Sequence, residues 1–192
     1  MKTSSPGSVP ALALFVGLAL ACAAPSGIHP RGLPEDAVPI DLGRFMGAWF
    51  VVAHIPTSVE ENAYEAVERY ALEPDGTIAV QFEFCEGGLG GPRQELTMTG
   101  WVYDPSTNAE WRVRPFWPLR LAYQILELDP DYTLTVIGHP SGDYAWVMAR
   151  QPEIDEVELA AITARLDAAG YETDRLRLVP HADGACRDGP PQ

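Results

Sequence analysis

The chain has 192 residues, of which 27 are acidic and 13 basic, so its formal net charge at pH 7 is −14. A surface this acidic repels the phosphates of nucleic acids and gains no attraction from an anionic membrane face. The composition therefore excludes an electrostatic nucleic-acid binder. It also excludes a protein that charge alone would hold on a membrane.

The first residues have the pattern of a secretory signal. Lys2 precedes the apolar run "ALALFVGLALAC", which is too short to span a bilayer and ends in small residues. We therefore predict a signal peptide over residues 1–21. The stretch Ala19-Leu20-Ala21-Cys22 resembles a bacterial lipobox, in which the cysteine is acylated, for example with palmitate, and becomes the mature N-terminus. Ordinary cleavage with release to the periplasm is the alternative.

Composition divides the remaining chain into one domain and two flanking segments. Residues 22–39 are rich in proline and small residues, which predicts a tether. Residues 40–182 are long enough to form one domain with a sizeable core. Residues 183–192 have the composition of a C-terminal tail.

Alternating apolar and polar residues predict β-strands through most of this domain. In "TIAVQFEF", for example, Ile78, Val80, Phe82 and Phe84 fall on one face, and turn sequences such as "EPDG" and "HPSGD" separate the apolar runs. Eight strands are predicted, at about 48–55, 64–72, 77–85, 95–103, 109–116, 120–128, 132–138 and 143–150.

A helical period replaces the strand period after these runs. Leu159, Ile162 and Leu166 recur at helical spacing, acidic residues begin the segment and Gly170 ends it, which predicts a helix at about 153–169. A short last strand follows in "DRLRLVP". Eight antiparallel strands can close into a barrel that leaves no exposed edge. The predicted fold class is therefore mostly β, an eight-stranded antiparallel up-and-down barrel with one C-terminal α-helix packed outside.

The cysteines give a further constraint on the domain. If Cys22 carries lipid, Cys85 and Cys186 remain, and an even pair in an oxidising compartment predicts a disulfide. Two free, buried thiols are the alternative.

Three short motifs, in order along the chain, resemble those of the lipocalin family. Gly47-Ala48-Trp49 matches the lipocalin G-x-W motif, and Gly142-Asp143-Tyr144 resembles the T-D-Y motif with glycine in place of threonine. Arg150 matches the arginine that completes the set. Around these motifs the sequence is similar to the bacterial outer-membrane lipoprotein lipocalins and to apolipoprotein D, over about residues 40 to 180.

The resemblance implies roles for several residues. In lipocalins the motif tryptophan fills the closed end of the barrel and the motif arginine lies across its indole, so Trp49 and Arg150 are expected to be structural. Many lipocalins tie a barrel strand to the C-terminal segment, which supports a bond between Cys85 and Cys186.

A lipocalin interior binds small apolar molecules, so inward-facing side chains are the candidate ligand contacts. By strand alternation these are Val51, Ala53, Phe82, Met98, Trp111, Val113 and Tyr123. For the aromatic members, filling of the core is the alternative. Arg114 and Arg120 flank a hairpin expected near the mouth, where they could meet a phosphate or carboxylate head group. Solvated surface arginines are the alternative there.

Signals of catalysis or metal binding are weak. His139, Ser141 and Asp143 lie within one turn, where they cannot form a catalytic triad with a buried relay. The glycine-rich stretch 87–91 leads into a strand, so it is no phosphate-binding loop. The four histidines are scattered without metal-ligand spacing. The sequence predicts no catalytic residue, no metal site and no cofactor.

These observations predict a binding protein that is anchored in the outer membrane through Cys22. The resemblance implies a fatty acid or lysophospholipid ligand, held for transport, storage or scavenging in the cell envelope. Two alternatives stay open. One is a lipocalin-fold enzyme acting on a bound lipid or isoprenoid, and the other is an envelope interaction protein with a filled barrel. The sequence leaves the oligomeric state open, monomer and dimer alike.

Overall fold

The computed structural model describes residues 39–182 and 186–188. The predicted signal peptide, most of the tether, Cys22 and most of the tail lie outside these residues. Eight strands form the main sheet: β1 (Gly47–Ile55), β2 (Ala63–Leu72), β3 (Ile78–Glu86), β4 (Arg93–Asp104), β5 (Glu110–Arg114), β6 (Leu121–Leu128), β7 (Leu134–Gly138) and β8 (Ala145–Ala149). Each one corresponds to a strand predicted from the sequence.

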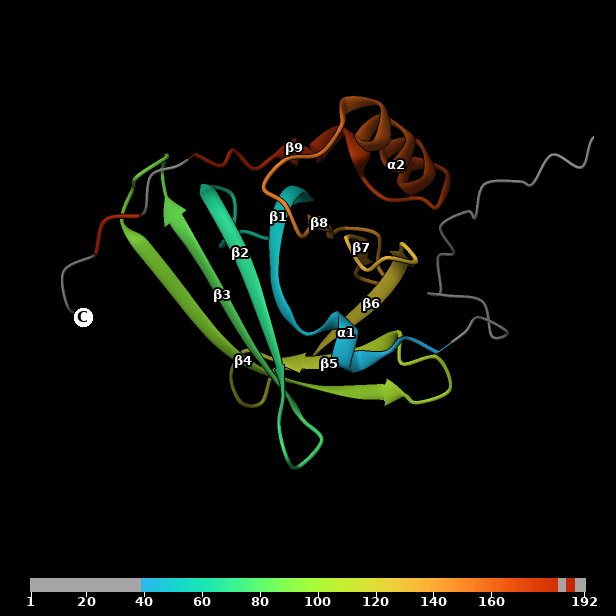
Figure 1. Cartoon of the computed structure of the whole chain (residues 1–192). Helices are drawn as coiled ribbons and strands as arrows, with labels where there is room; N and C mark the ends of the chain where they lie inside the picture. Colours follow the sequence, from blue (N-terminus) through green and yellow to red (C-terminus); the bar gives the residue numbers. More distant parts are fainter. Residues whose placement is uncertain (1–38, 183–185, 189–192) are drawn as a thin grey trace, which may run out of the picture.

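Each strand pairs antiparallel with its neighbours in the chain, and the sheet closes on itself. Strand β1 pairs with β8 on one side and with β2 on the other, as in the partners Phe50–Ala149 and Trp49–Glu68. The order β1 to β8 is therefore an up-and-down barrel, and Figure 1 shows its strands wrapping around a common interior. The predicted fold class is confirmed.

Two clusters of buried apolar side chains lie on opposite faces of the sheet. The interior cluster fills the barrel: Ile40, Phe45, Trp49, Val51, Ala63, Ala66, Tyr70, Ile78, Val80, Phe82, Phe84, Ala109, Trp111, Val113, Tyr123, Ile125, Ile137, Met148 and Val179. The outer cluster lies between the barrel and the C-terminal helix: Val52, Ala53, Ile55, Leu126, Val136, Ala145, Val147, Ala149, Ile162, Leu166 and Tyr171. Strands β6 to β8 and β1 contribute to both clusters, which explains why both of their faces are apolar.

The predicted helix is present as α2 (Glu156–Ala168), and it lies against the outside of the barrel (Figure 1). Asp155 begins it, because its carboxylate accepts hydrogen bonds from the backbone N–H groups of Val157 and Glu158. Arg165 pairs with Glu127 of β6 at 2.7 Å, which fixes the helix to the barrel wall beside the buried contacts. No helix in the described ranges is long and apolar enough to cross a membrane.

Three short elements complete the chain. The four-residue helix α1 (Leu42–Phe45) precedes β1, and the 3-10 turn η1 (Thr173–Arg175) leads into β9 (Arg177–Leu178). Strand β9 pairs with β1 at Ala53 and His54, next to the point where β2 leaves β1. The sequence predicted the last strand but not α1, which is too short for a periodic signal.

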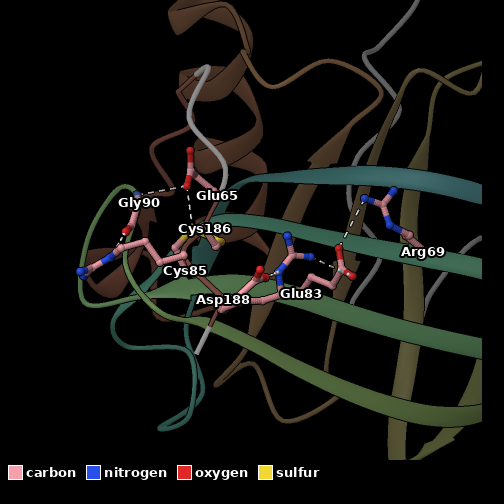
Figure 2. The surroundings of a disulfide bond; sticks show 9 residues. Glu65, Arg69, Glu83, Cys85, Gly90, Cys186 and Asp188 are labelled. Carbon is pink, nitrogen blue, oxygen red and sulfur yellow. Dashed lines mark hydrogen bonds and ion pairs between the residues drawn. A yellow bond between two sulfur atoms is a disulfide. The ribbon is translucent and has the colours of Figure 1, made fainter. Parts of the chain in front are cut away.

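The C-terminal segment is tied back to the barrel by a disulfide. Cys85 near the end of β3 is bonded to Cys186, with a Cα–Cα distance of 5.2 Å and a sequence separation of 101 residues. Figure 2 shows this bond with Glu65 beside it. The predicted pairing of Cys85 with Cys186 is present in the structure.

Candidate functional site

The closed end of the barrel is built around Trp49. Its side chain is fully buried, and its indole N–H donates to the Phe45 carbonyl of α1 at 2.8 Å. The Arg150 guanidinium carbon lies 3.8 Å from the Trp49 ring centroid. A cation held over an indole is attracted by the ring quadrupole. Trp49 is thus held by both α1 and Arg150, and the arginine lies across its indole as the motif resemblance implied.

Arg150 also joins the separate segments of the closed end through hydrogen bonds. Its guanidinium donates to the backbone carbonyls of Arg44, Phe45, Met46 and Ala48 and to that of Tyr132. Gly47 follows α1 with φ +97°, and a Cβ there would lie 3.4 Å from the Arg150 Nη1. The glycine therefore turns the chain from α1 into β1 right beside the guanidinium.

Gly142, where the lipocalin motif has threonine, occupies a position that only glycine fits. Its φ is +83°, and a Cβ at this site would come within 2.9 Å of the Gly170 carbonyl oxygen that follows α2. Asp143 and Tyr144 follow in the same turn. The carbonyl of Asp143 accepts a weak hydrogen bond from Arg175 at 3.4 Å. The departure from the motif therefore lets the β7–β8 turn pack against the end of the helix.

Six of the predicted ligand contacts lie in or against the interior cluster. Val51, Phe82, Trp111, Val113 and Tyr123 belong to it, and the half-buried Met98 packs against it. The Trp111 and Tyr123 rings stack with centroids 5.3 Å apart, because these residues are cross-strand partners on β5 and β6. The structure therefore brings these predicted contacts to one lumen.

Ala53 was expected to point inward, and the structure corrects this expectation. The register between β1 and β8 shifts between Val51 and Ala53, so the strand carries a bulge at Val52. A bulge adds one residue to a strand and reverses which face the following residues occupy. Ala53 consequently packs in the outer cluster under α2, and His54 takes the inward face beside Trp146.

Burial changes from one end of the lumen to the other. Near the closed end, Trp49, Trp111, Ile125 and Ile137 have no exposed surface. Along β3 to β6, toward the hairpin end, inward-facing side chains keep some exposure although they are apolar. This group comprises Phe82, Phe84, Val113 and Tyr123, with the half-buried Leu96 and Met98 and the exposed Leu121. Solvent therefore reaches the hairpin end of the lumen at Leu96, Met98 and Leu121, next to the buried aromatic side chains.

A carboxyl group faces this apolar lumen, and sequence patterns did not single it out. Glu68 on β2 is buried opposite Phe82, and the Tyr70 hydroxyl donates to its Oε2. The Tyr70 and Tyr123 hydroxyls are 2.5 Å apart, which links β2 to β6 across the barrel. Burial, with a further contribution from the charge of Glu60, raises the pKa of Glu68 to about 8. Glu68 is therefore uncharged at neutral pH.

A second group of polar side chains lines the β1–β8 side near the open end. Glu60 accepts a hydrogen bond from the Trp146 indole N–H at 2.9 Å and another from the Thr57 backbone. His54 is fully buried, and neither of its ring nitrogens has a hydrogen-bond partner among the described residues. Burial, together with the nearby charge of Arg177, lowers the pKa of His54 to about 3. The imidazole is thus neutral at physiological pH.

The two arginines predicted for the mouth lie on the outer face of the barrel beside the β5–β6 hairpin. Arg114 ends β5 and alternates with the inward Val113, and Arg120 lies 5.2 Å from the Trp101 ring centroid. Between them Phe116 and Trp117 are largely exposed, the latter at 82%. The hairpin therefore presents both cations and aromatic rings to solvent next to the open end of the lumen.

Outside the barrel, a pocket of about 280 Å³ lies between the wall and the C-terminal segment. It is lined by Phe50, Glu65, Val67, Glu83, Arg93, Pro152, Glu153, His181, Ala182 and Cys186. Figure 2 shows the disulfide, Glu65 and Glu83 in this region. The carboxylate of Glu65 approaches the Cys85 sulfur at 2.6 Å, but both cysteine sulfurs are shared in the disulfide. This group therefore offers no thiolate to a metal ion.

The cluster of His139, Ser141 and Asp143 forms a turn. The His139 Nδ1 and the Ser141 hydroxyl are 2.8 Å apart, and Asp143 joins them through its backbone N–H at 3.4 Å. Its carboxylate does not orient the imidazole in this arrangement, as a catalytic triad would require.

Comparisons with known proteins agree with this geometry. Residues 40–181 match the model of the lipocalin-like domain family. Temperature-induced lipocalin-1 of Arabidopsis thaliana is 29% identical over 153 residues, which cover 75% of this chain and 81% of the relative. Outer membrane lipoprotein Blc of Escherichia coli K12 is 28% identical over 151 residues, covering 77% and 83% of the two chains.

A solved structure with the same fold is that of insecticyanin from the tobacco hornworm Manduca sexta. It superposes with a TM-score of 0.58 at 15% identity, over 82% of this chain and 90% of that chain. At this identity the likeness shows the fold alone.

Proposed function

The chain belongs to the lipocalin family, and from this premise we propose that its barrel binds an amphipathic lipid, a fatty acid or a lysophospholipid. The observation that carries the proposal is the burial gradient of the lumen. The closed end is filled by Trp49 and its neighbours, whereas the inward-facing Leu96, Met98 and Leu121 toward the open end are half-buried or exposed. Such an apolar wall suits an alkyl chain, because burying a methylene group contributes about 0.8 kcal/mol.

The charged end of the lipid would remain at the open end. The inner lumen carries Glu68 and, nearer the mouth, Glu60, and neither attracts an anionic group. Arg114 and Arg120 flank the β5–β6 hairpin beside the open end, where a guanidinium can pair with a carboxylate or phosphate. We infer that the alkyl chain enters first and that the head group stays near these arginines.

Location in the outer membrane through Cys22 is part of the same proposal. It is supported by the lipobox-like stretch before Cys22 and by relatives that are named outer membrane lipoproteins. The formal charge of −14 gives the protein no electrostatic attraction to anionic lipids, so an acyl anchor would have to hold it there. A role in lipid transport, storage or scavenging in the envelope follows from this placement.

Lipid binding can be tested on the delipidated mature protein by its intrinsic tryptophan fluorescence. Titration with palmitate, a lysophospholipid and retinol should give a saturable change at one equivalent for at least one lipid. Met98→Trp should weaken this binding at least tenfold, because Met98 is half-buried against the interior cluster and the larger indole side chain would fill the accessible lumen. Val157→Trp is the matched control, since Val157 is 77% exposed on α2.

The outcomes separate the proposal from its alternatives. A flat response to every amphiphile, from a protein that melts cooperatively, would mean that the barrel is filled and that the protein acts through its outer surface. A lipid that binds but is recovered chemically changed would favour an enzyme. Recovery of the unchanged lipid, released by extraction, is the result we expect.

Replacing both hairpin arginines tests the orientation of the lipid. Arg114→Gln with Arg120→Gln should weaken binding of palmitate more than binding of the uncharged palmityl alcohol. Arg69→Gln on the outside of β2 serves as control, because Arg69 pairs with Glu83 away from the open end. Equal losses for both lipids would show that the arginines do not hold the carboxylate.

A further inference from the structure

The lumen contains a neutral hydrogen-bonding group on an otherwise apolar wall. Glu68 and Tyr70 of β2 and Tyr123 of β6 face the interior. The Tyr70 hydroxyl joins the three residues, because it donates to Glu68 Oε2 and also contacts the Tyr123 hydroxyl. Their backbone neighbours across the sheet are apolar: Phe82 opposite Glu68, and Val80 opposite Tyr70. A carboxyl group is rarely buried among such side chains unless it has a specific role.

This group has unused hydrogen-bonding capacity. Among the described residues, only Oε2 of Glu68 is engaged by another side chain, which leaves Oε1 without a protein partner. Glu68 keeps 6% of its surface exposed and Tyr123 keeps 9%, whereas the neighbouring Trp111 has none. Glu68 and Tyr123 therefore lie where the filled end of the lumen, around Trp111, gives way to side chains that keep some exposure.

His54 is an independent indication that a bound molecule could form hydrogen bonds in the same lumen. It is fully buried on the inward face of β1, and both of its ring nitrogens lack a partner among the described residues. A buried polar group without a partner costs about 1–3 kcal/mol. Such a cost is offset when a bound molecule or water supplies the missing hydrogen bonds.

The protonation states of Glu68 and His54 determine which ligand group can bind beside them. Burial keeps both side chains uncharged at neutral pH, because it raises the pKa of Glu68 to about 8 and lowers that of His54 to about 3. Burial and the charge of Glu60, which disfavour the ionised form of Glu68, would disfavour a ligand carboxylate at the same place. A neutral oxygen can instead accept a hydrogen bond from one of these groups and, if it belongs to a hydroxyl, donate a hydrogen bond to another.

We propose that Glu68 and Tyr123 form an inner subsite for a hydroxyl or carbonyl oxygen on the buried chain of the ligand, so that the barrel selects oxygenated lipids over plain acyl chains. The inference rests on the proposed function, because it requires a lipid in the lumen. The head group then stays at the open end, and the oxygen on the chain reaches the subsite above Trp111.

The test compares two lipids that differ only at the far end of the chain. Palmitate and ω-hydroxypalmitate are titrated separately into the delipidated mature protein, and the ratio of their dissociation constants is measured. We expect the hydroxylated lipid to bind on the order of tenfold more tightly, the effect of about one well-formed buried hydrogen bond. The ratio is insensitive to the active fraction of a preparation, since both lipids meet the same protein.

Two variants assign the preference to the subsite. Tyr123→Phe and Glu68→Leu each remove one polar group at similar volume, and each should bring the ratio close to one while palmitate affinity holds or rises. Tyr103→Phe is the matched control, because Tyr103 lies on the outer face under Arg112 and is 60% exposed. The control should keep the full preference.

The possible results are distinct. Equal affinity of the native protein for the two lipids would overturn the subsite and leave the proposed function standing. Absence of binding by either lipid would overturn the proposed function itself. A tenfold preference that persists in both Tyr123→Phe and Glu68→Leu, in variants that still melt cooperatively, would show that the hydroxyl is recognised elsewhere and would overturn the assignment to Glu68 and Tyr123.

Discussion

The guanidinium of Arg150 lies over the Trp49 indole at 3.8 Å and donates hydrogen bonds to backbone carbonyls on both sides of the α1–β1 junction. The end of the barrel after β8 is thereby fastened to the start of β1. Because Trp49 is fully buried beneath this contact, the pair closes the barrel and Trp49 has no surface left for a ligand.

Trp49→Ala should accordingly lower stability and spare binding. Removing a buried tryptophan typically costs about 3–5 kcal/mol of unfolding free energy. Urea unfolding should show this loss, while lipid affinity measured without urea should change by less than about threefold, because the accessible wall is intact. Trp117→Ala is the control. Trp117 is almost fully exposed, so its loss should cost no more than about 0.5 kcal/mol. Unchanged unfolding with lost binding would make Trp49 a ligand contact.

Gly142 should tolerate no side chain. It shares a positive φ with Gly76, at +83° and +84°, but only at Gly142 would a Cβ meet a backbone atom, the Gly170 carbonyl oxygen at 2.9 Å. Gly76→Ala should therefore cost only the left-handed conformation, about 1–2 kcal/mol, and Gly142→Ala clearly more. Thermal and urea unfolding of both variants measure the difference. Equal losses would mean that the turn and the helix end do not pack as described.

The strand order and the outer helix could be predicted because they depend on local periodicity. Alternation in β3 and the helical spacing of Leu159, Ile162 and Leu166 are visible in the sequence, and so are the turns between strands. The closed end was predictable for a different reason. Trp49 and Arg150 belong to recognisable motifs, and their contact follows from the family resemblance.

The polar part of the lumen could not be predicted, because it depends on register. A bulge at Val52 is invisible in an apolar run, yet it moves Ala53 to the outer cluster and turns His54 inward. Glu68 stands in "AVERY", where it cannot be told from the solvated Arg69 beside it until β2 is aligned with β3. Its link to Tyr123, through the Tyr70 hydroxyl, also joins residues that are far apart in the chain. Irregular registers therefore set the limit of the sequence prediction.

Removing the disulfide should destabilise the protein strongly. The bond between Cys85 and Cys186 spans 101 residues, and closing a loop of about that length contributes roughly 4–5 kcal/mol in the chain-entropy model. The double variant Cys85→Ser, Cys186→Ser should unfold at a markedly lower urea concentration than the oxidised protein. The native protein treated with a reductant should approach the same midpoint. Identical midpoints for the oxidised protein and the double variant would show that the bond contributes nothing to stability.

Two buried titratable groups in the lumen, Glu68 and His54, predict an unusual pH dependence of stability. The pKa of Glu68 is raised from 4.5 to about 8, so between these values the folded state holds a proton that the unfolded state has lost. Stability therefore falls as pH rises through this window, by up to about 1.4 kcal/mol per unit. The pKa of His54 is lowered from 6.5 to about 3, so below 6.5 the unfolded state holds the extra proton and stability falls as pH decreases.

The two effects oppose each other between pH 4.5 and 6.5 and should leave a plateau there, with a decline from 6.5 to about 8 that is due to Glu68 alone. Urea unfolding across this range measures both. Glu68→Gln should abolish the decline above pH 6.5, because it removes the proton that the folded state retains. His54→Leu should turn the plateau into a slope, with stability increasing as pH falls from 6.5 to 4.5. A native profile that stays flat up to pH 9 would show that Glu68 is ionised without cost, and so that water reaches it freely in the lumen.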